Sequence, residues 1–157
     1  MNVLFVCSGN ICRSPAAEAI LKSNLPDSEK NSIKVDSAGI LGIEGQPAPE
    51  PLLVLLAEKG ISLFQHRSKG ITKELVEMSD LILVMEPEHL KYFMGRYPGI
   101  ENKLDLLGHF GRSEGYAGKH IITDPYGGSV EEYKVAIDRI ETEVQRIIPF
   151  LIKQRPK

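Results

Sequence analysis

Apolar residues in this chain form short unbroken runs, separated by segments of helical periodicity. Residues 3–6 and 81–85 are wholly apolar, which predicts two strands that are buried on both faces of a sheet. Residues 33–35 and 103–105 predict two weaker strands, and residues 36–39 are expected to close the first of these two. The pattern therefore predicts a sheet with a buried centre.

Helical segments lie between and after these strands. Apolar positions recur every three or four residues between polar, glycine or proline breaks, which predicts helices at residues 16–25, 50–59, 72–78, 88–97 and 130–151. We expect Pro149 to kink or end the last helix and residues 153–157 to fray. The alternation of strands and helices predicts an α/β fold, with a parallel sheet that carries helices on both faces.

Length and composition narrow the class of protein. The chain has 157 residues, enough for one domain that spans residues 1–157. Its net charge of −2 argues against general binding to nucleic acid or to an anionic membrane. No apolar stretch has spanning length, and residues 1–6 lead directly into the next motif, so we expect no signal peptide. Two cysteines make no disulfide framework, and we therefore expect a cytoplasmic protein.

The segment between the first strand and the first helix has the features of an anion site. Residues 7–13 form a tight loop, because Pro15 marks the first turn of the helix. Backbone N–H groups of such a loop, and the first N–H groups of the helix, point inward without partners. Gly9 is expected to supply the backbone angles of the curl, and the planar guanidinium of Arg13 matches the oxygens of a phosphoryl group.

Cys7 opens this loop and is the candidate nucleophile. The helix N-terminus and Arg13 both favour its thiolate, and Ser14 is placed to give the sulfur a hydrogen bond. A cysteine after an apolar strand is often only a small buried residue. The spacing Cys-x5-Arg-Ser, between a strand and a helix that starts with proline, favours catalysis instead. The chemistry would be attack on phosphorus, a cysteinyl-phosphate intermediate and hydrolysis.

Residues 6–15, Val-Cys-Ser-Gly-Asn-Ile-Cys-Arg-Ser-Pro, resemble the signature of the low-molecular-weight protein tyrosine phosphatases. A second motif of that family, Asp-Pro-Tyr, stands at residues 124–126, so the resemblance covers nearly the whole chain. It implies a four-stranded parallel sheet in the order 2-1-3-4, with a phosphate-binding loop after strand 1. It also implies that the following residues surround the phosphoryl group: Ser8, Gly9, Asn10, Ile11, Cys12, Arg13 and Ser14.

His66 is a lone histidine, and such residues are more often structural than catalytic. The resemblance agrees, since it implies that Ser37 and His66 join a hydrogen-bond network that braces Asn10. That network would hold the loop in a strained curl.

Asp124 is the candidate general acid, which would give a proton to the leaving oxygen. The residues alone leave this role and a plain Asp-Pro turn, with Ser129 as a helix cap, equally open. The resemblance to the family's acid motif favours catalysis, and it implies that Tyr126 flanks the substrate ring. Gly127 stands where several relatives carry a second aromatic residue, so we expect a more open pocket on this side.

Residues 40–49 follow the second strand and form either a surface connection or a wall of the pocket. Relatives often offer aromatic side chains here, whereas Ile40, Leu41 and Ile43 are aliphatic. This departure argues against ring stacking from that side.

Cys12 is either a small residue of the loop wall or, as in relatives with this cysteine, a partner that forms a disulfide with Cys7 after oxidation. His109 and His120 lie in residues 107–123, the stretch with the least regular pattern. We expect them to be solvated loop residues rather than metal ligands, because they lack the spacing of a metal site. We expect no metal and no other cofactor.

The chain is therefore predicted to hydrolyse protein phosphotyrosine, with Cys7, Arg13 and Asp124 as catalytic residues. A protein arginine phosphatase on the same fold is the alternative, since residues 124–134 look similar to that branch. Ile11 favours the tyrosine branch, because the arginine branch carries a small threonine at this position.

Two other classes fit less well. An arsenate reductase on this fold needs additional cysteines, and a plain phosphate-binding module does not need a nucleophile, an arginine and an acid together. The expected partner is a phosphotyrosine-containing protein; bacterial relatives often act on autophosphorylating tyrosine kinases. We expect a monomer that binds neither nucleic acid nor membrane.

Overall fold

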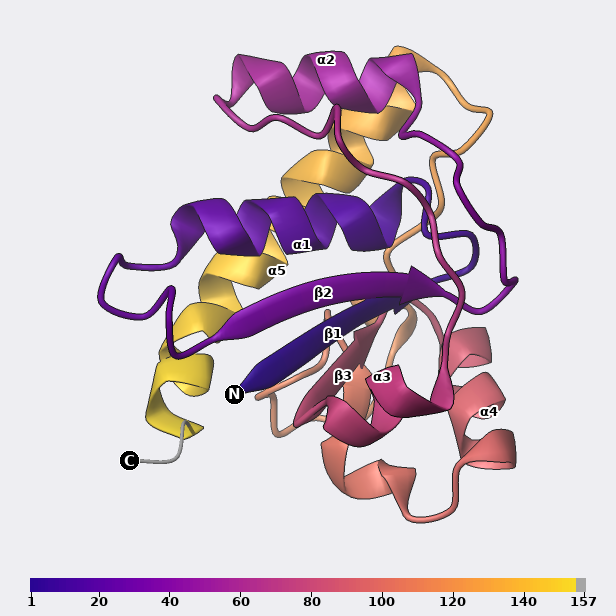
Figure 1. Cartoon of the computed structure of the whole chain (residues 1–157), viewed down its shortest axis with the longest axis vertical. Coiled ribbons are helices and arrows are strands. Elements are labelled where there is room, and N and C mark those ends of the chain that lie inside the picture. Colours follow the sequence, from indigo (N-terminus) through magenta and orange to yellow (C-terminus); the bar gives the residue numbers. More distant parts are fainter. Residues whose placement is uncertain (155–157) are drawn as a thin grey trace.

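Parallel strands form the centre of the protein, in a computed structural model that describes residues 1–154 (Figure 1). The strands are β1 (Asn2–Cys7), β2 (Lys34–Gly39), β3 (Leu81–Val84) and β4 (Leu104–Leu106). They lie in the order β2-β1-β3-β4, and each neighbouring pair is parallel. The predicted sheet and its strand order are confirmed.

Helices cover both faces of this sheet. Figure 1 shows α1, α2 and α5 on one side and α3 and α4 on the other. The helices are α1 (Arg13–Asn24), α2 (Glu50–Glu58), α3 (Lys73–Met78), α4 (Pro87–Arg96) and α5 (Val130–Gln154). Short 3₁₀ turns lie at Ile100–Lys103 and Gly118–His120. Within residues 1–154, no helix combines the length and the apolar character that crossing a bilayer requires.

The side chains of β1 alternate between two hydrophobic cores. Val3 and Phe5 pack in the core that contains residues of α1, α2 and α5, whereas Leu4 and Val6 pack in the core that contains residues of α3 and α4. Because helices cover both faces of the sheet at this strand, the side chains on both faces of β1 are buried. The unbroken apolar run of residues 3–6 follows from this position.

β2 is longer than the strand that the sequence predicts. Residues 36–39 continue the strand instead of closing it. β2 is an edge strand, so the polar Asp36 is tolerated there, and it pairs with Lys69 Nζ at 2.7 Å. The register places Gly39 opposite Cys7, so β2 accompanies β1 to the point where the candidate anion loop begins.

Pro149 lies inside α5, which continues to Gln154, so the helix does not end at the proline. Ile147 and Leu151 are buried on either side of it, and the packing of this apolar stripe outweighs the lost backbone hydrogen bond. Residues 153–154 belong to the helix rather than to a frayed tail, and residues 155–157 lie outside the described residues.

Residues 107–123 contain little regular structure, as predicted, but the neighbouring helix holds them in place. Arg146 of α5 donates a hydrogen bond to the carbonyl oxygen of Phe110 at 2.6 Å. The expectation that His120 is solvated is wrong: it is 1% exposed, and its Nδ1 accepts the N–H of Ala117 at 3.0 Å. This anchored segment leads the chain back to the sheet just before Asp124.

Candidate active site

The loop of residues 7–13 joins the end of a strand to the start of a helix. β1 ends at Cys7, and α1 begins at Arg13. Within residues 1–154, no side chain caps the N-terminus of α1. The first N–H groups of this helix are therefore available to an anion that binds inside the loop.

Cys7 is buried at the start of the loop, and its Sγ lies 3.0 Å from Ser14 Oγ. Ser14 Oγ accepts an N–H from Asn10 Nδ2 at 2.9 Å, so its own hydrogen can go to Cys7 or to the carbonyl oxygen of Ala38 at 3.4 Å. A thiolate is a charged acceptor and makes the stronger hydrogen bond. The geometry thus lets Ser14 donate to an ionised sulfur.

Asn10 adopts a left-handed backbone conformation, with φ of 57°, and its hydrogen bonds hold this conformation in place. Its Nδ2 donates to Ser14 Oγ and to Ser37 Oγ, both at 2.9 Å. Its Oδ1 accepts the backbone N–H of Lys69 at 3.0 Å, and its carbonyl oxygen lies 2.7 Å from His66 Nε2. The structure therefore brings Ser37 and His66 onto Asn10, from β2 and from the segment before α3.

Gly39, at the end of β2, allows the loop to approach closely. A Cβ atom at this position would lie 2.7 Å from Asn10 N, which is too close for a carbon atom. The expectation for Gly9 is wrong, because Gly9 has no positive φ and the left-handed residue of the curl is Asn10. A Cβ atom at Gly9 would lie 3.3 Å from Ile11 Cδ1 and 3.5 Å from Ile43 Cδ1, so the glycine leaves room for these two side chains.

Arg13 is 1% exposed, and protein acceptors surround most of its guanidinium. Nη1 donates to the carbonyl oxygen of Ile122 at 3.0 Å and lies 3.4 Å from Glu86 Oε2. Nη2 donates to Ser8 Oγ at 3.3 Å and lies 3.4 Å from Asp124 Oδ2. Nε is buried, and within the described residues it has no partner. Its N–H is therefore a donor that remains available to a ligand.

Asp124 reaches Arg13 from the segment that precedes α5. Its carboxylate is 44% exposed, and its Oδ1 accepts the backbone N–H of Tyr126 at 3.1 Å. Ser129 caps α5 as well: its Oγ accepts the N–H of Glu132 at 3.2 Å, and its own N–H donates to Glu132 Oε2 at 2.9 Å. The Ser129 cap is therefore present, and Asp124 also lies beside Arg13; the role of Asp124 as general acid stays a prediction.

These side chains enclose a cavity of about 180 Å³. Its lining residues are Cys7, Ser8, Gly9, Ile11, Cys12, Arg13, Leu41, Ile43, Asp124 and Tyr126. Residues 40–49 are therefore a wall of the pocket rather than a plain surface connection. Leu41 and Ile43 form this wall, while Ile40 packs against the core on the α4 side of the sheet.

Cys12 lies at the N-cap of α1 and is buried. Burial raises the pKa of its thiol to about 12. Its Sγ donates a weak hydrogen bond to the hydroxyl oxygen of Tyr133 at 3.9 Å. Cys12 is therefore a neutral thiol near pH 7 and is not the nucleophile.

Glu86 and His89 belong to this site, although the sequence analysis did not select them. Glu86 contacts Arg13, and His89, fully buried on α4, has its Nε2 3.0 Å from Ser8 Oγ. A signal for them exists in the sequence, since Glu86 follows the apolar run of residues 81–85 directly and His89 stands three residues further on. The carboxyl ends of neighbouring parallel strands meet at one edge of a sheet, so polar residues after β3 lie near those after β1.

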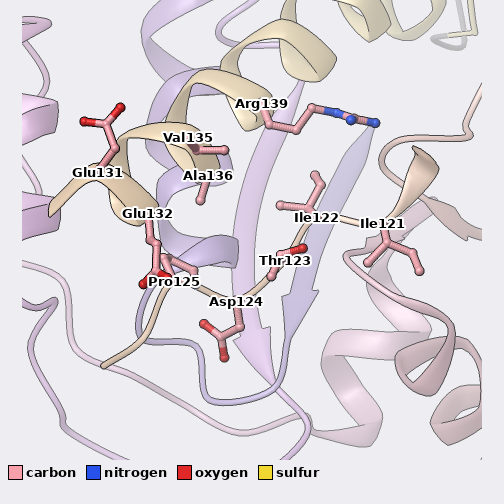
Figure 2. A pocket seen from close by; sticks show the side chains of 10 residues that line it. All are labelled: Ile121, Ile122, Thr123, Asp124, Pro125, Glu131, Glu132, Val135, Ala136 and Arg139. Carbon is pink, nitrogen blue, oxygen red and sulfur yellow. The ribbon is translucent and has the colours of Figure 1, made fainter. Parts of the chain in front are cut away.

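A larger cavity of about 530 Å³ is lined by residues 121–125 and by side chains of α5 (Figure 2). In Figure 2 the carboxylate of Asp124 points away from Val135 and Ala136, which line this cavity on the α5 side. Its lining residues include no cysteine and no part of the loop of residues 7–13. Chemistry, rather than size, therefore identifies the smaller cavity as the candidate active site.

The two histidines of residues 107–123 have protein partners. His109 Nδ1 lies 3.0 Å from Asp105 Oδ1, and His120 accepts a backbone N–H. Across residues 1–154, no three His, Cys, Asp or Glu side chains lie together in a way that could hold a metal ion.

Comparisons with known proteins agree with this arrangement. A profile of the family described as "Low molecular weight phosphotyrosine protein phosphatase" matches residues 2–157. The chain is 35% identical, over 156 residues and 99% of each chain, to a protein-arginine-phosphatase from Bacillus subtilis.

Solved structures show the same similarity. The YwlE arginine phosphatase from Geobacillus stearothermophilus matches with a TM-score of 0.84 and 36% identity, over 98% of this chain and 94% of that one. The tyrosine phosphatase AmsI from Erwinia amylovora matches with a TM-score of 0.81 and 33% identity, over 94% of this chain and 91% of that one. The chain belongs to the low molecular weight phosphotyrosine protein phosphatase family.

Proposed function

We propose that this chain hydrolyses protein phosphotyrosine through a cysteinyl-phosphate intermediate. The observation that carries the proposal is the Nε–H of Arg13, a buried donor without a partner in the described residues. Leaving such a donor unsatisfied is costly, and native structures rarely do so without a functional reason. A phosphoryl oxygen would satisfy it, inside the same cavity as the Cys7 sulfur.

Binding of the phosphoryl group rearranges the contacts of Arg13. The Nε–H and one Nη2–H of a guanidinium are parallel, and they match two oxygens of a phosphoryl group. Nη2 pairs with Asp124 Oδ2 at 3.4 Å in the free protein, so the substrate takes the place of this carboxylate. Asp124 is then free to carry the proton that the leaving oxygen needs.

The chemistry proceeds in two steps. The Cys7 thiolate attacks phosphorus in line, the S–P bond forms as the P–O bond to the tyrosyl group breaks, and Asp124 gives its proton to the tyrosyl oxygen. Water then attacks the phosphocysteine, Asp124 takes up a proton from it, and the thiolate leaves with release of inorganic phosphate. The loop N–H groups and Arg13 stabilise the charge in both steps, which is the largest catalytic contribution. No step uses a metal, so loss of activity in a chelator would contradict this mechanism.

The apolar wall of the cavity favours a tyrosyl group. Ile11, Leu41 and Ile43 line it, and the flat face of an aryl ring packs well against aliphatic side chains. A phosphoguanidinium group carries further N–H donors, which these side chains cannot accept. The resemblance noted above also assigns isoleucine at position 11 to the tyrosine branch.

Hydrolysis of protein phosphoarginine is the second candidate function. Relatives from Bacillus subtilis and Geobacillus stearothermophilus are named protein-arginine-phosphatases, and they are 35% and 37% identical to this chain. Gly127 after the aromatic Tyr126 also agrees with that branch.

Initial rates on phosphotyrosine and phosphoarginine peptides of otherwise equal sequence decide between the two, with Cys7→Ser as the blank. We expect kcat/KM for phosphotyrosine to be higher by about tenfold or more, and Ile11→Thr to reduce that ratio. A preference for phosphoarginine would replace the first function by the second. Cleavage of neither peptide, with no difference between Cys7→Ser and the unaltered protein, would refute the catalytic proposal.

We also propose that Cys12 protects Cys7 from irreversible oxidation, because both thiols line one cavity. Peroxide would oxidise Cys7 to a sulfenic acid, the Cys12 thiol would form the disulfide with release of water, and a thiol reductant would restore both residues. Cys12→Ser should keep phosphatase turnover but recover poorly after peroxide treatment. Full recovery of that variant would contradict a protective role.

The partner we propose is a phosphotyrosine-containing protein, such as an autophosphorylating tyrosine kinase. We also propose that this chain is a monomer and that it acts in the cytoplasm. Both cysteines are free thiols, which suits a reducing compartment. Light scattering of the purified protein tests the monomer, and a dimer at micromolar concentration would contradict it.

A further inference from the structure

Ser8 links the loop of residues 7–13 to α4. Its Oγ lies 3.0 Å from Nε2 of His89 and 3.3 Å from Nη2 of Arg13. Ser8 lines the cavity, whereas His89 lies beneath it with 0% exposure. Within the described residues, these are the two hydrogen bonds that Ser8 Oγ makes.

The surroundings of His89 decide which ring nitrogen carries a hydrogen. The backbone N–H of Met85 donates to Nδ1 at 3.4 Å, which requires an unprotonated Nδ1. Burial lowers the pKa of His89 to about 4, so the ring is neutral near pH 7 and its one hydrogen is on Nε2. Ser8 Oγ is the nearer acceptor for it, since Glu86 Oε1 lies at 3.5 Å.

Ser8 Oγ therefore accepts two hydrogen bonds, one from His89 and one from Arg13, which fill the two acceptor sites of a hydroxyl oxygen. We propose that His89 and Ser8 are positioning residues that hold one Nη2 hydrogen of Arg13, so that the other Nη2 hydrogen and the Nε–H stay directed at the phosphoryl group. This inference rests on the proposed function, because it names further residues for the same site.

The place where Ser8 contacts the guanidinium of Arg13 explains how Ser8 can affect phosphate binding. Ile122 and Glu86 hold Nη1, whereas Nε–H has no partner in the described residues. On the Nη2 side the protein offers Ser8 and Asp124, and the substrate displaces Asp124. Once a phosphoryl group binds, Ser8 is the protein group that still fixes Nη2.

The test measures binding of inorganic phosphate by calorimetry, which does not depend on turnover. Ser8→Ala should weaken phosphate binding by about fivefold, the factor expected for one hydrogen bond. His89→Leu should weaken it by a similar or smaller factor, and the double variant should be no weaker than Ser8→Ala alone, because both changes act through one contact. In kinetics with an aryl phosphate, the same variants should lower kcat/KM by at least the same factor.

Conservative variants separate positioning from folding. Ser8→Thr keeps the accepting hydroxyl, and His89→Gln keeps an N–H donor, so both should bind phosphate within about twofold of the unaltered protein. Thermal unfolding shows which variants remain folded; if His89→Leu does not fold, Ser8→Ala and His89→Gln still decide the question. In an Arg13→Lys background, which lacks the guanidinium fork, Ser8→Ala should have no further effect.

Two results would overturn the inference. The first is that the Ser8→Ala variant binds phosphate as tightly as the unaltered protein. The second is that Ser8→Ala weakens phosphate binding by the same factor in the Arg13→Lys background. Hydrolysis of phosphotyrosine with either result would leave the proposed function intact. Phosphate binding that follows the expected pattern, without hydrolysis of any phosphoester, would instead reject the function and keep the positioning roles.

Discussion

The loop of residues 7–13 and the segment of residues 122–126 meet at Arg13, but the protein holds them in different ways. Asn10 and Arg13 are 0% and 1% exposed, and hydrogen bonds from several elements fix each of them. The carboxylate of Asp124 is 44% exposed, and Tyr126 is 64% exposed. The first region is mostly buried and is braced by hydrogen bonds, whereas in the second Thr123, Asp124 and Tyr126 are exposed to solvent.

The difference matches what each region has to do in the proposed reaction. The loop must present fixed N–H donors to a group whose charge is spread over several oxygens, and donors that are already oriented stabilise such a charge best. Asp124 must leave Arg13 when the substrate binds and then exchange a proton twice, which requires an accessible side chain. In the proposed reaction, the residues that bind the anion are therefore held in place, whereas the side chain of the general acid, Asp124, can move.

Removal of the proposed general acid, Asp124, should have the largest effect on turnover and leave the affinity for phosphate unchanged. Asp124→Asn should lower kcat by about 10²–10⁴-fold on an alkyl- or tyrosyl-type phosphate, because the leaving oxygen then departs without a proton. The loss should be much smaller on an aryl phosphate whose leaving group is already a good one. Steady-state kinetics on the two substrates measures the difference, and an equal loss on both would contradict the assignment of Asp124.

Arg13→Lys tests the other region, the braced loop of residues 7–13. A lysine cannot keep the parallel Nε–H and Nη2–H donors, so we expect kcat/KM to fall by about 10²–10³-fold, irrespective of the leaving group. Phosphate binding should weaken as well, in contrast to Asp124→Asn. Inhibition by inorganic phosphate gives the second readout, and unchanged inhibition would show that the guanidinium does not hold the anion.

Local patterns in the sequence predicted those elements of the protein that depend on residues close together in the chain. The apolar runs of β1 and β3, the loop between Cys7 and Arg13 and the amphipathic α5 follow from residues that are close in the chain. The alternation of strands and helices predicted a parallel sheet, and the family resemblance supplied the strand order 2-1-3-4; the structure confirms both.

The parts that the sequence did not predict depend on contacts between distant segments. Residues 36–39 look like a strand end, but they remain extended because they pair with β1. His120 looks like a loop residue, but it is buried where its segment folds back towards the sheet. Glu86 and His89 acquire a role only because β3 lies beside β1, which no short window of sequence shows.

Asn10→Ala should weaken the bracing of the loop. It removes the donors to Ser14 and Ser37 and the acceptor for Lys69, and it leaves an alanine in a left-handed conformation. We expect the free energy of unfolding to fall by about 2–4 kcal/mol. Asn10→Gly is the matched control, because it loses the same hydrogen bonds without the backbone strain and should be more stable than the alanine variant by about 1 kcal/mol. Denaturant unfolding measures both, and equal stability of the two would argue against a strained curl.

Tyr126→Ala should have the smallest effect, because this side chain is 64% exposed and lies at the open edge of the pocket wall. Loss of a ring that packs on the substrate corresponds to roughly 0.5–1.5 kcal/mol, so we expect KM for a phosphotyrosine peptide to rise by about threefold to tenfold with little change in kcat. Tyr126→Phe keeps the ring and should behave as the unaltered protein, and inorganic phosphate should inhibit all three equally. If Tyr126→Ala instead lowered kcat as strongly as Asp124→Asn, the open segment would be controlling the position of the acid, and the separation between a rigid anion site and a free acid would fail.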